Sequence, residues 1–181
     1  MRLVILDRDG VINQESEAYI KSPDEWRPIP GSLEAIGQLH RAGFMVAVAT
    51  NQAGVGRGLF TREALDKIHA KMQAAVEQVG GRLDAICVCP HRPEDHCSCR
   101  KPEPGLLLQI AARFAVGLGS VPVIGDSWRD VQAAVRVGAR PILVRTGFGE
   151  RAVARRMAGA GVEVFKDLAA ASEQLLHEVR G

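Results

Sequence analysis

Short apolar runs recur along the chain, and polar residues follow each of them. The runs are uninterrupted rather than alternating, which is typical of strands buried on both faces of a parallel sheet. They predict strands at residues 3–6, 44–49, 83–89, 121–124, 140–144 and 162–165.

Between these runs, apolar residues recur at intervals of three and four, as on one face of an amphipathic helix. After Thr61 this spacing includes Leu65, Ile68 and Met72 and predicts a long helix that ends at Gly80. Further helices are predicted from Gly31–Ser32 to about Gly43, at 103–115, 128–137 and 150–160, and at the C-terminal end. Strands that alternate with helices indicate an α/β fold with a doubly wound, mainly parallel sheet.

The size and charge of the chain narrow its class. Its 181 residues fit one domain, residues 1–181, and the predicted helices fill the gaps between strands, so we expect no large cap domain. With 23 basic and 21 acidic residues, the charge is too balanced to indicate a nucleic-acid partner. The apolar runs are too short to span a bilayer, and residues 1–10 do not resemble a signal peptide. We therefore expect a cytoplasmic protein without a membrane partner, and a monomer.

Polar side chains follow three of the predicted strands. Asp7 and Asp9 come directly after the first strand, Thr50 after the second and Asp126 after the fourth. Ligands of such sheets bind beyond the carboxyl ends of the strands, so these side chains are expected to share one cavity. Two neighbouring carboxylates repel each other unless a divalent cation binds, and Asp126 would complete an oxygen site suited to Mg²⁺. The alternative for the segment from Asp7 to Gly10 is a simple turn.

A cationic segment adds to this set. Arg100 and Lys101 lie just before a predicted helix, whose N-terminus also favours anions. Carboxylates, a metal ion, the hydroxyl of Thr50 and a lysine are the groups that phosphoryl transfer requires. The sequence therefore predicts phosphate chemistry at this end of the sheet.

Four segments resemble, in order, the motifs of the haloacid-dehalogenase (HAD) superfamily. They are LVILDRDG (residues 3–10), VATN (48–51), RKP (100–102) and GDSWRD (125–130). The resemblance covers most of residues 3–145. It implies a HAD-like, Rossmann-type fold and a magnesium-dependent phosphatase.

The same resemblance implies roles for individual residues. Asp7 would attack phosphorus and carry the phosphate, and Asp9 would act as general acid and base. Thr50 and Lys101 would bind the transferring phosphoryl group. The Mg²⁺ ligands would be Asp7, the backbone carbonyl of Asp9, and Asp126. Asp130 has two interpretations, a carboxylate behind the metal site or a residue of the first helical turn.

Three of the four cysteines lie with a histidine in a stretch of eleven residues, 89–99. Three sulfurs and an imidazole so close together are typical of a closed, structural zinc site. The predicted ligands are Cys89, His91, Cys97 and Cys99. Cys87 belongs instead to the apolar strand. His96 adjoins Cys97 too closely for both to bind the same ion. The alternative is a mobile loop with unligated thiols.

Within the superfamily, residues 7–13, 50–58 and 89–102 resemble the heptose-1,7-bisphosphate 7-phosphatases. This implies removal of the 7-phosphate of D-glycero-D-manno-heptose 1,7-bisphosphate through an aspartyl-phosphate, in the ADP-heptose pathway for the lipopolysaccharide core. It also implies substrate contacts from Glu15, Ser16, Tyr19, Asn51, Gln52, Ala53, Arg100 and Ser127.

Other functions stay open at this point. Histidinol-phosphate phosphatases share much of the pattern, including a zinc loop. A zinc-braced nucleic-acid-binding module is the alternative from another class, although the complete acidic motifs and the balanced charge argue against it. The sequence leaves open whether Arg57 and Arg145 reach the substrate.

Overall fold

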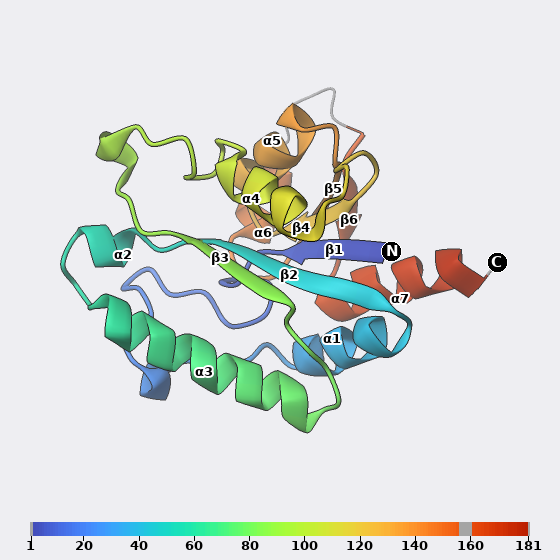
Figure 1. Cartoon of the computed structure of the whole chain (residues 1–181), viewed down its shortest axis with the longest axis horizontal. Coiled ribbons are helices and arrows are strands. Elements are labelled where there is room, and N and C mark those ends of the chain that lie inside the picture. Colours follow the sequence, from blue (N-terminus) through green and yellow to red (C-terminus); the bar gives the residue numbers. More distant parts are fainter. Residues whose placement is uncertain (1, 156–160, 181) are drawn as a thin grey trace.

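A six-stranded parallel sheet forms the centre of the molecule, in the order β3-β2-β1-β4-β5-β6 (Figure 1). The computed structural model describes residues 2–155 and 161–180. The strands are β1 (Arg2–Leu6), β2 (Phe44–Asn51), β3 (Ala85–Cys89), β4 (Pro122–Gly125), β5 (Arg140–Val144) and β6 (Glu163–Phe165). The predicted parallel α/β architecture is confirmed.

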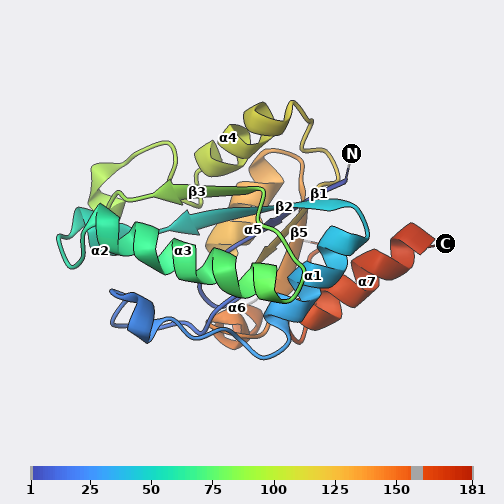
Figure 2. The same cartoon turned by 60° about the horizontal axis from the view of Figure 1, so that its bottom comes forward.

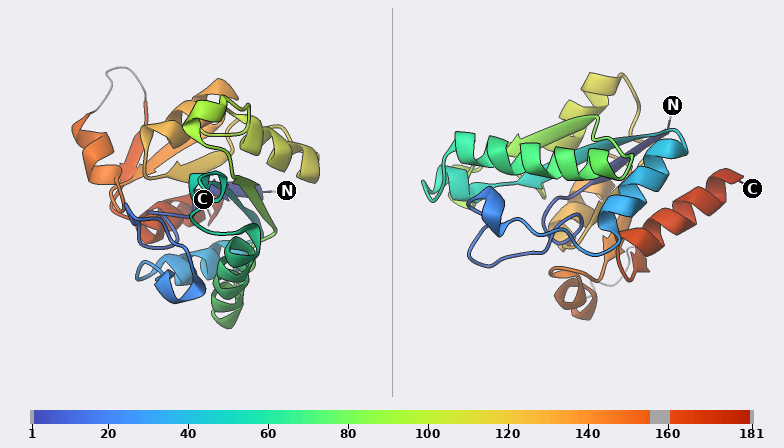
Figure 3. Two further views of the ribbon diagram at one scale, coloured as in Figure 1. Left: turned by 90° about the vertical axis from the view of Figure 1, so that its left-hand side faces the viewer. Right: turned by 90° about the horizontal axis from the view of Figure 1, so that it is seen from below.

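Helices cover both faces of this sheet. They are α1 (Ser32–Arg41), α2 (Ala53–Gly56), α3 (Arg62–Gln78), α4 (Gly105–Phe114), α5 (Trp128–Arg136), α6 (Gly149–Ala154) and α7 (Leu168–Arg180). Figures 2 and 3 show α1, α3 and α7 on one face and α4 on the other. Among the described helices, none combines the length and apolar character needed to cross a membrane.

The side chains of β1 explain why its apolar run does not alternate with polar residues. Val4 and Leu6 pack into the cluster formed with α1, α3 and α7, whereas Leu3 and Ile5 point into the cluster with α4 and α5. All four are almost completely buried. Each such side chain contributes about 1.5–3 kcal/mol to the stability of the sheet.

The element boundaries differ from the prediction at several places; β3, for example, begins at Ala85 and not at residue 83. β2 continues through Asn51 because its last two residues pair with the end of β3. The glycine-rich segment at 51–58 contains the short helix α2. α4 begins at Gly105 and not at residue 103, so Pro104 occupies its N-cap position and not its first turn. The predicted helix at 150–160 is observed as α6, and the end of the prediction, at 156–160, lies outside the described residues.

The strand order reverses between β1 and β4, which places a crevice at the carboxyl ends of these two strands. Ile5 and Leu6 pair with Val123 and Ile124, and the next amide, that of Asp7, donates to the Ile124 carbonyl at 2.9 Å. The left panel of Figure 3 looks onto this end of the molecule. The residues that follow both strands are therefore brought together.

Candidate active site

A buried carboxylate cluster occupies this crevice. Asp7 follows β1, Asp126 follows β4, and Asp130 lies in the first turn of α5. One oxygen from each lies within 4.8 Å of the others. The amide of Phe148 donates to Asp126 Oδ2 at 2.8 Å and fixes that side chain. The loop after β5 thus helps to form the cluster.

The electrostatics of the cluster favour a cation. Burial and the charge of Asp130 raise the pKa of Asp7 to about 7, although the charge of Lys101 acts in the opposite direction. Burial and the charges of Asp7 and Asp130 raise the pKa of Asp126 to about 8. Neighbouring carboxylates that resist ionisation in this way form an oxygen site that fits a hard divalent ion such as Mg²⁺.

Lys101 is the cation that the chain itself provides. Its buried Nζ lies 3.0 Å from Asp7 Oδ1 and 2.6 Å from Asp130 Oδ1, and it donates to the Ala49 carbonyl at 2.7 Å. Those two carboxylates raise the pKa of Lys101 against the effect of burial. The Asn51 side chain holds the Lys101 backbone through two hydrogen bonds of 3.0 Å. Both polar atoms of Asn51, a predicted substrate contact, are thus engaged with the protein.

The structure combines both interpretations of Asp130. Its Oδ2 accepts from the Ser127 amide at 3.1 Å and from the Ser127 hydroxyl at 2.6 Å, which caps α5. Its Oδ1 contacts Lys101. Asp130 therefore belongs to the first helical turn and also supports the cluster, and the proton of the predicted substrate contact Ser127 is directed at it.

Asp9 is held by side chains that favour its ionised form. Arg8 donates to its two oxygens at 2.9 and 3.0 Å, Asn13 at 2.9 Å and Gln52 at 2.8 Å. Burial alone would raise the pKa of Asp9, but the charge of Arg8 and these hydrogen bonds lower it. The Gln52 amide also donates to Thr50 Oγ1 at 2.9 Å. The structure thus joins three predicted site residues, Asp9, Thr50 and Gln52.

The turn after β1 needs a glycine. Gly10 has φ +78° and its Cα faces Asp126 so closely that a Cβ would overlap the carboxylate. The hydroxyl of Thr146 donates to the Gly10 carbonyl at 2.6 Å. A side chain at position 10 would therefore displace Asp126 or the loop.

The segment that carries the predicted substrate contacts Glu15, Ser16 and Tyr19 approaches Asp9. Burial and the charge of Asp9 raise the pKa of Glu15 to about 7. The Ser16 hydroxyl accepts from the Ala18 amide at 3.2 Å, and Tyr19 is half-buried. Glu15 therefore brings this segment close to Asp9.

A cavity of about 600 Å³ adjoins Lys101, and its lining carries more basic than acidic side chains, since Glu103 is its one acidic residue. Arg100 and Arg129 both line it. Burial and the charge of Arg129 lower the pKa of Arg100, so the two guanidinium groups repel each other. Such a pair favours an anionic ligand. Ala53, also a predicted contact, is buried at the start of α2.

The four predicted zinc ligands form one cluster. The Cys89 sulfur lies 3.6 Å from the Cys97 sulfur and 3.1 Å from that of Cys99, and His91 Nδ1 lies 3.3 Å from the Cys99 sulfur. These separations are close to those of ligands around a tetrahedral ion at about 2.0–2.3 Å. All four donor atoms lie within 4.8 Å of one another. The group contains neither Cys87 nor His96.

Two arginines whose role the sequence leaves open are engaged at the surface. Arg57 pairs with Glu94 at 3.4 Å, which links the segment after α2 to the cysteine loop. Arg145 pairs with Glu150 at 3.1 Å. Neither contacts the carboxylate cluster in the residues that the structure describes.

Three functional candidates were missed by the sequence analysis. Arg8 occupies the variable position between the two aspartates, and His69 is part of the apolar stripe of α3. Arg129 lies inside the GDSWRD segment, at one of the variable positions between the two aspartates of the motif. For His69, its place on an otherwise apolar helical face is the signal that could have indicated a buried polar partner.

Comparison with known proteins agrees with this geometry. The family model described as polynucleotide kinase 3 phosphatase matches residues 2–124, and the HAD-hydrolase-like model matches residues 98–171. The D-glycero-beta-D-manno-heptose-1,7-bisphosphate 7-phosphatase of Bordetella bronchiseptica is 53% identical, over 98% of this chain and 99% of the relative. The enzyme of the same name from Pseudomonas putida is 49% identical, over 97% of this chain and 100% of the relative.

A solved structure is similar over the same length. The crystal structure of D,D-heptose 1,7-bisphosphate phosphatase from B. bronchiseptica, complexed with magnesium and phosphate, superposes with a TM-score of 0.96. It covers 98% of this chain and 99% of its own, at 53% identity. The chain therefore belongs to the HAD superfamily of phosphatases and, within it, to the family of D-glycero-beta-D-manno-heptose-1,7-bisphosphate 7-phosphatases.

Proposed function

We propose that this protein removes the 7-phosphate of D-glycero-β-D-manno-heptose 1,7-bisphosphate, in the ADP-heptose pathway that supplies the lipopolysaccharide core. The observation that carries the proposal is the full-length similarity to enzymes named for this reaction. The carboxylate cluster and Lys101 at the strand-order reversal supply the chemistry. The names of these relatives favour the heptose bisphosphate over histidinol phosphate.

Asp7 is the proposed nucleophile. Its Oδ1 accepts from the Arg8 amide at 2.7 Å and from Lys101, whereas Oδ2 accepts no hydrogen bond from the residues that the structure describes. Oδ2 would form the bond to phosphorus as the bond between phosphorus and the sugar oxygen breaks. The product of this step is an aspartyl-phosphate and the sugar alcohol.

Asp9 is the proposed acid and base. It would give a proton to the leaving sugar oxygen and then take one from the water that attacks the aspartyl-phosphate. The proton taken in the second step is available for the next leaving group, so the cycle balances. The low pKa of Asp9 favours the form that activates water. Thr50 and Lys101 would bind the oxygens of the transferring group.

Mg²⁺ fits the carboxylate cluster, with Asp7, Asp126 and the Asp9 carbonyl as proposed ligands. When bound, Mg²⁺ neutralises charge on the cluster and on the transferring phosphate. The raised pKa values of Asp7 and Asp126 indicate that this charge is not balanced by the protein alone.

The stabilising effect of Mg²⁺ is expected to increase with pH. The pKa values of Asp7 and Asp126 rise on folding from 3.8 to about 7 and about 8. The metal-free protein therefore loses stability as the pH rises from 3.8 through these folded-state pKa values, because the buried carboxylates must then ionise. Because Mg²⁺ binds the ionised carboxylates, the gain in Tm on adding it should be larger at about pH 8.5 than at about pH 6. Thermal unfolding at both pH values, with the Asp126→Asn variant as control, measures this. An equal gain at both pH values contradicts it.

The cavity beside Lys101 is the proposed site for the phosphate that is retained. Arg100 and Arg129 present two guanidinium groups, which suit a phosphate dianion. Arg100 directly follows Cys99, the last residue of the cysteine loop, and its Nη1 donates to the His91 carbonyl at 3.4 Å. We assign recognition of the 1-phosphate to this pair.

A substrate panel tests this assignment. The kcat/KM is expected to be highest for the heptose 1,7-bisphosphate, lower for the heptose 7-phosphate and lowest for histidinol phosphate, because only the first presents a second phosphate to Arg129. Arg129→Gln should raise KM about 10-fold or more for the bisphosphate and leave it unchanged for the heptose 7-phosphate, since a charged hydrogen bond is worth about 1.5–3 kcal/mol.

The matched control is Arg145→Gln, which removes an exposed arginine paired with Glu150 away from the cavity. Its kinetics should equal those of the wild type on every substrate. Preference for histidinol phosphate would overturn the substrate assignment, and an equal rise in KM for both heptose phosphates would overturn the role of Arg129.

We further propose that zinc, held by Cys89, His91, Cys97 and Cys99, is structural. Four protein ligands would leave no open position for a substrate. The ion would brace the segment that presents Arg100 and Lys101. The four cysteines form no disulfide, and cysteines persist in this reduced form in the cytosol, which supports a cytoplasmic location.

The proposed enzyme acts as a monomer of one domain without a nucleic-acid partner. The residues of the candidate site come from the loops at one end of one sheet. The formal net charge of +2 supports a small-molecule substrate.

A further inference from the structure

We propose that His69 is a positioning residue for acid–base catalysis, which fixes Arg8 so that Arg8 holds the Asp9 carboxylate in place. The proposal rests on the function proposed above and adds a residue of α3, far from the site in sequence, to its machinery. It follows from a chain of contacts that begins in the helix layer beneath the sheet and ends at Asp9.

Arg8 is the central link. Its side chain is completely buried, and a buried guanidinium is costly unless its donors are paired. Nε and Nη2 donate to the two oxygens of Asp9, and Nη1 lies 3.2 Å from Nε2 of His69. The planar group is therefore fixed at both ends, by Asp9 on one side and by His69 on the other.

His69 acts as the hydrogen-bond acceptor in this contact. Burial and the charge of Arg8 lower its pKa to about 4, so the ring is neutral at physiological pH. A guanidinium only donates, and Nε2 must therefore carry a lone pair and the proton must lie on Nδ1. The histidine thus relieves an otherwise unpaired donor of a buried cation.

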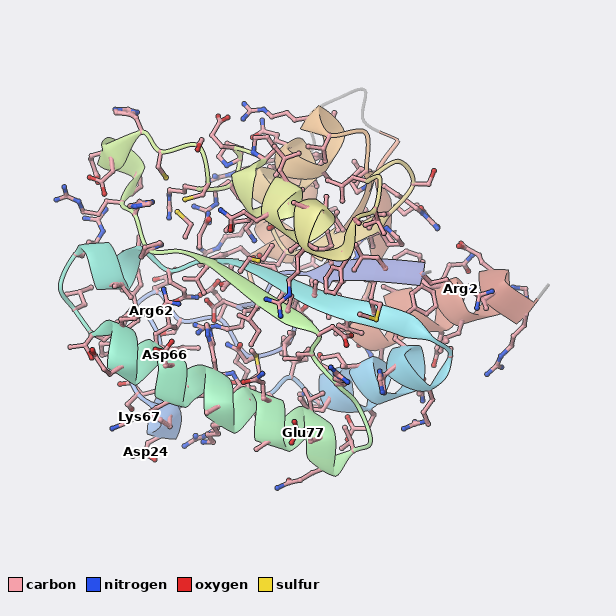
Figure 4. The ribbon with its side chains drawn as sticks, in the orientation of Figure 1. Arg2, Asp24, Arg62, Asp66, Lys67 and Glu77 are labelled. Carbon is pink, nitrogen blue, oxygen red and sulfur yellow. The ribbon has the colours of Figure 1, made fainter. Side chains whose placement is uncertain are left out.

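His69 lies on the face of α3 where the other buried side chains are apolar. The charged side chains Arg62, Asp66, Lys67 and Glu77 lie along the exposed face of α3 (Figure 4). His69 is only 7% exposed and lies on the opposite face, with Ile68 and Met72. An aliphatic side chain would fill this space without the cost of burying a polar ring. The contact with Arg8 is what the imidazole adds.

The orientation of the Asp9 carboxylate depends on the contacts that run from His69 through Arg8. Asn13 and Gln52 hold one oxygen each, whereas Arg8 grips both and sets the plane of the carboxylate. Without the acceptor at position 69, the guanidinium can turn to find another partner, and the carboxylate turns with it. Small displacements of a proton donor reduce the rate of transfer strongly.

The test compares two leaving groups. The wild type, His69→Leu and His69→Gln are assayed with heptose 1,7-bisphosphate and with p-nitrophenyl phosphate. The sugar alcohol needs a proton from Asp9 to leave, whereas p-nitrophenolate leaves without one, and kcat/KM reports on steps up to this departure. The ratio of the two kcat/KM values does not depend on how much of the protein is folded.

His69→Leu is expected to lower this ratio about 10-fold or more, because the acid step alone is impaired. His69→Gln, whose amide oxygen can accept from Arg8, should restore most of it. Val76→Ala is the matched control, a buried position two turns further along α3, where loss of packing should leave the ratio unchanged. An unchanged ratio in His69→Leu, or no rescue by His69→Gln, would overturn the proposal.

These outcomes are separate from failure of the proposed function. If the wild type hydrolyses neither ester, the function itself is wrong. If it hydrolyses both and the ratio stays constant across the His69 variants, the phosphatase assignment stands and only the role of His69 falls.

Discussion

Replacing Asp7 by asparagine is expected to lower kcat by at least about 10⁴-fold, while the protein remains folded. The amide keeps the shape of the side chain but cannot form a stable bond to phosphorus. The fold should persist because Lys101 retains Asp130 as its partner at 2.6 Å. Steady-state kinetics, circular dichroism and thermal unfolding measure the two effects together.

The variant Asp9→Asn distinguishes the role of the nucleophile from that of the general acid. It should reduce kcat/KM for the sugar phosphate by about 10²–10⁴-fold and much less for p-nitrophenyl phosphate, whereas Asp7→Asn should abolish turnover of both. If Asp7→Asn, shown by mass spectrometry to be free of deamidation, keeps more than about 1% of the wild-type kcat, Asp7 is not the nucleophile.

The sequence is sufficient to predict those site residues that directly follow a strand. Asp7, Thr50 and Asp126 each follow an apolar run, and parallel strands deliver their last residues to the same edge. The ligands of the cysteine loop are likewise close together along the chain. For both, position in the chain is enough to infer proximity in space.

Contacts that depend on side-chain direction are not visible in the sequence. The pairing of Arg8 with His69 joins residues 61 positions apart, and it requires both the turn after β1 and the angle of α3. Arg129 follows Ser127 by two residues, and only the cap of α5 determines that it faces Arg100. The packing of helices on the sheet decides such contacts.

The ends of elements were mispredicted where neighbouring segments compete with local preference. Thr50 and Asn51 extend β2 because β3 offers partners in Val88 and Cys89. This extension matters for the site, because the strand then directs Asn51 toward the Lys101 backbone. Strand length depends on pairing, which local composition does not reveal.

Cys99→Ala is expected to abolish zinc binding and to lower Tm by about 10 °C, because it removes one of the four proposed ligands of the proposed structural zinc. Loss of the ion frees the loop from Cys89 to Arg100. The KM for the bisphosphate should rise as Arg100 becomes mobile, and kcat should change less, because Asn51 holds the Lys101 backbone independently. Metal analysis, thermal unfolding and kinetics on protein prepared without chelators measure these effects.

Cys87→Ala is the matched control, since it removes the one remaining cysteine of the chain. Cys87 packs against the core beneath α4 and does not belong to the group of four donor atoms that lie within 4.8 Å of one another. This variant should keep its zinc and lose only the modest stability of a small core truncation. Protein that contains no zinc in either variant and none in the wild type would refute the zinc site. Equal zinc in Cys99→Ala and the wild type would show that the ion binds elsewhere.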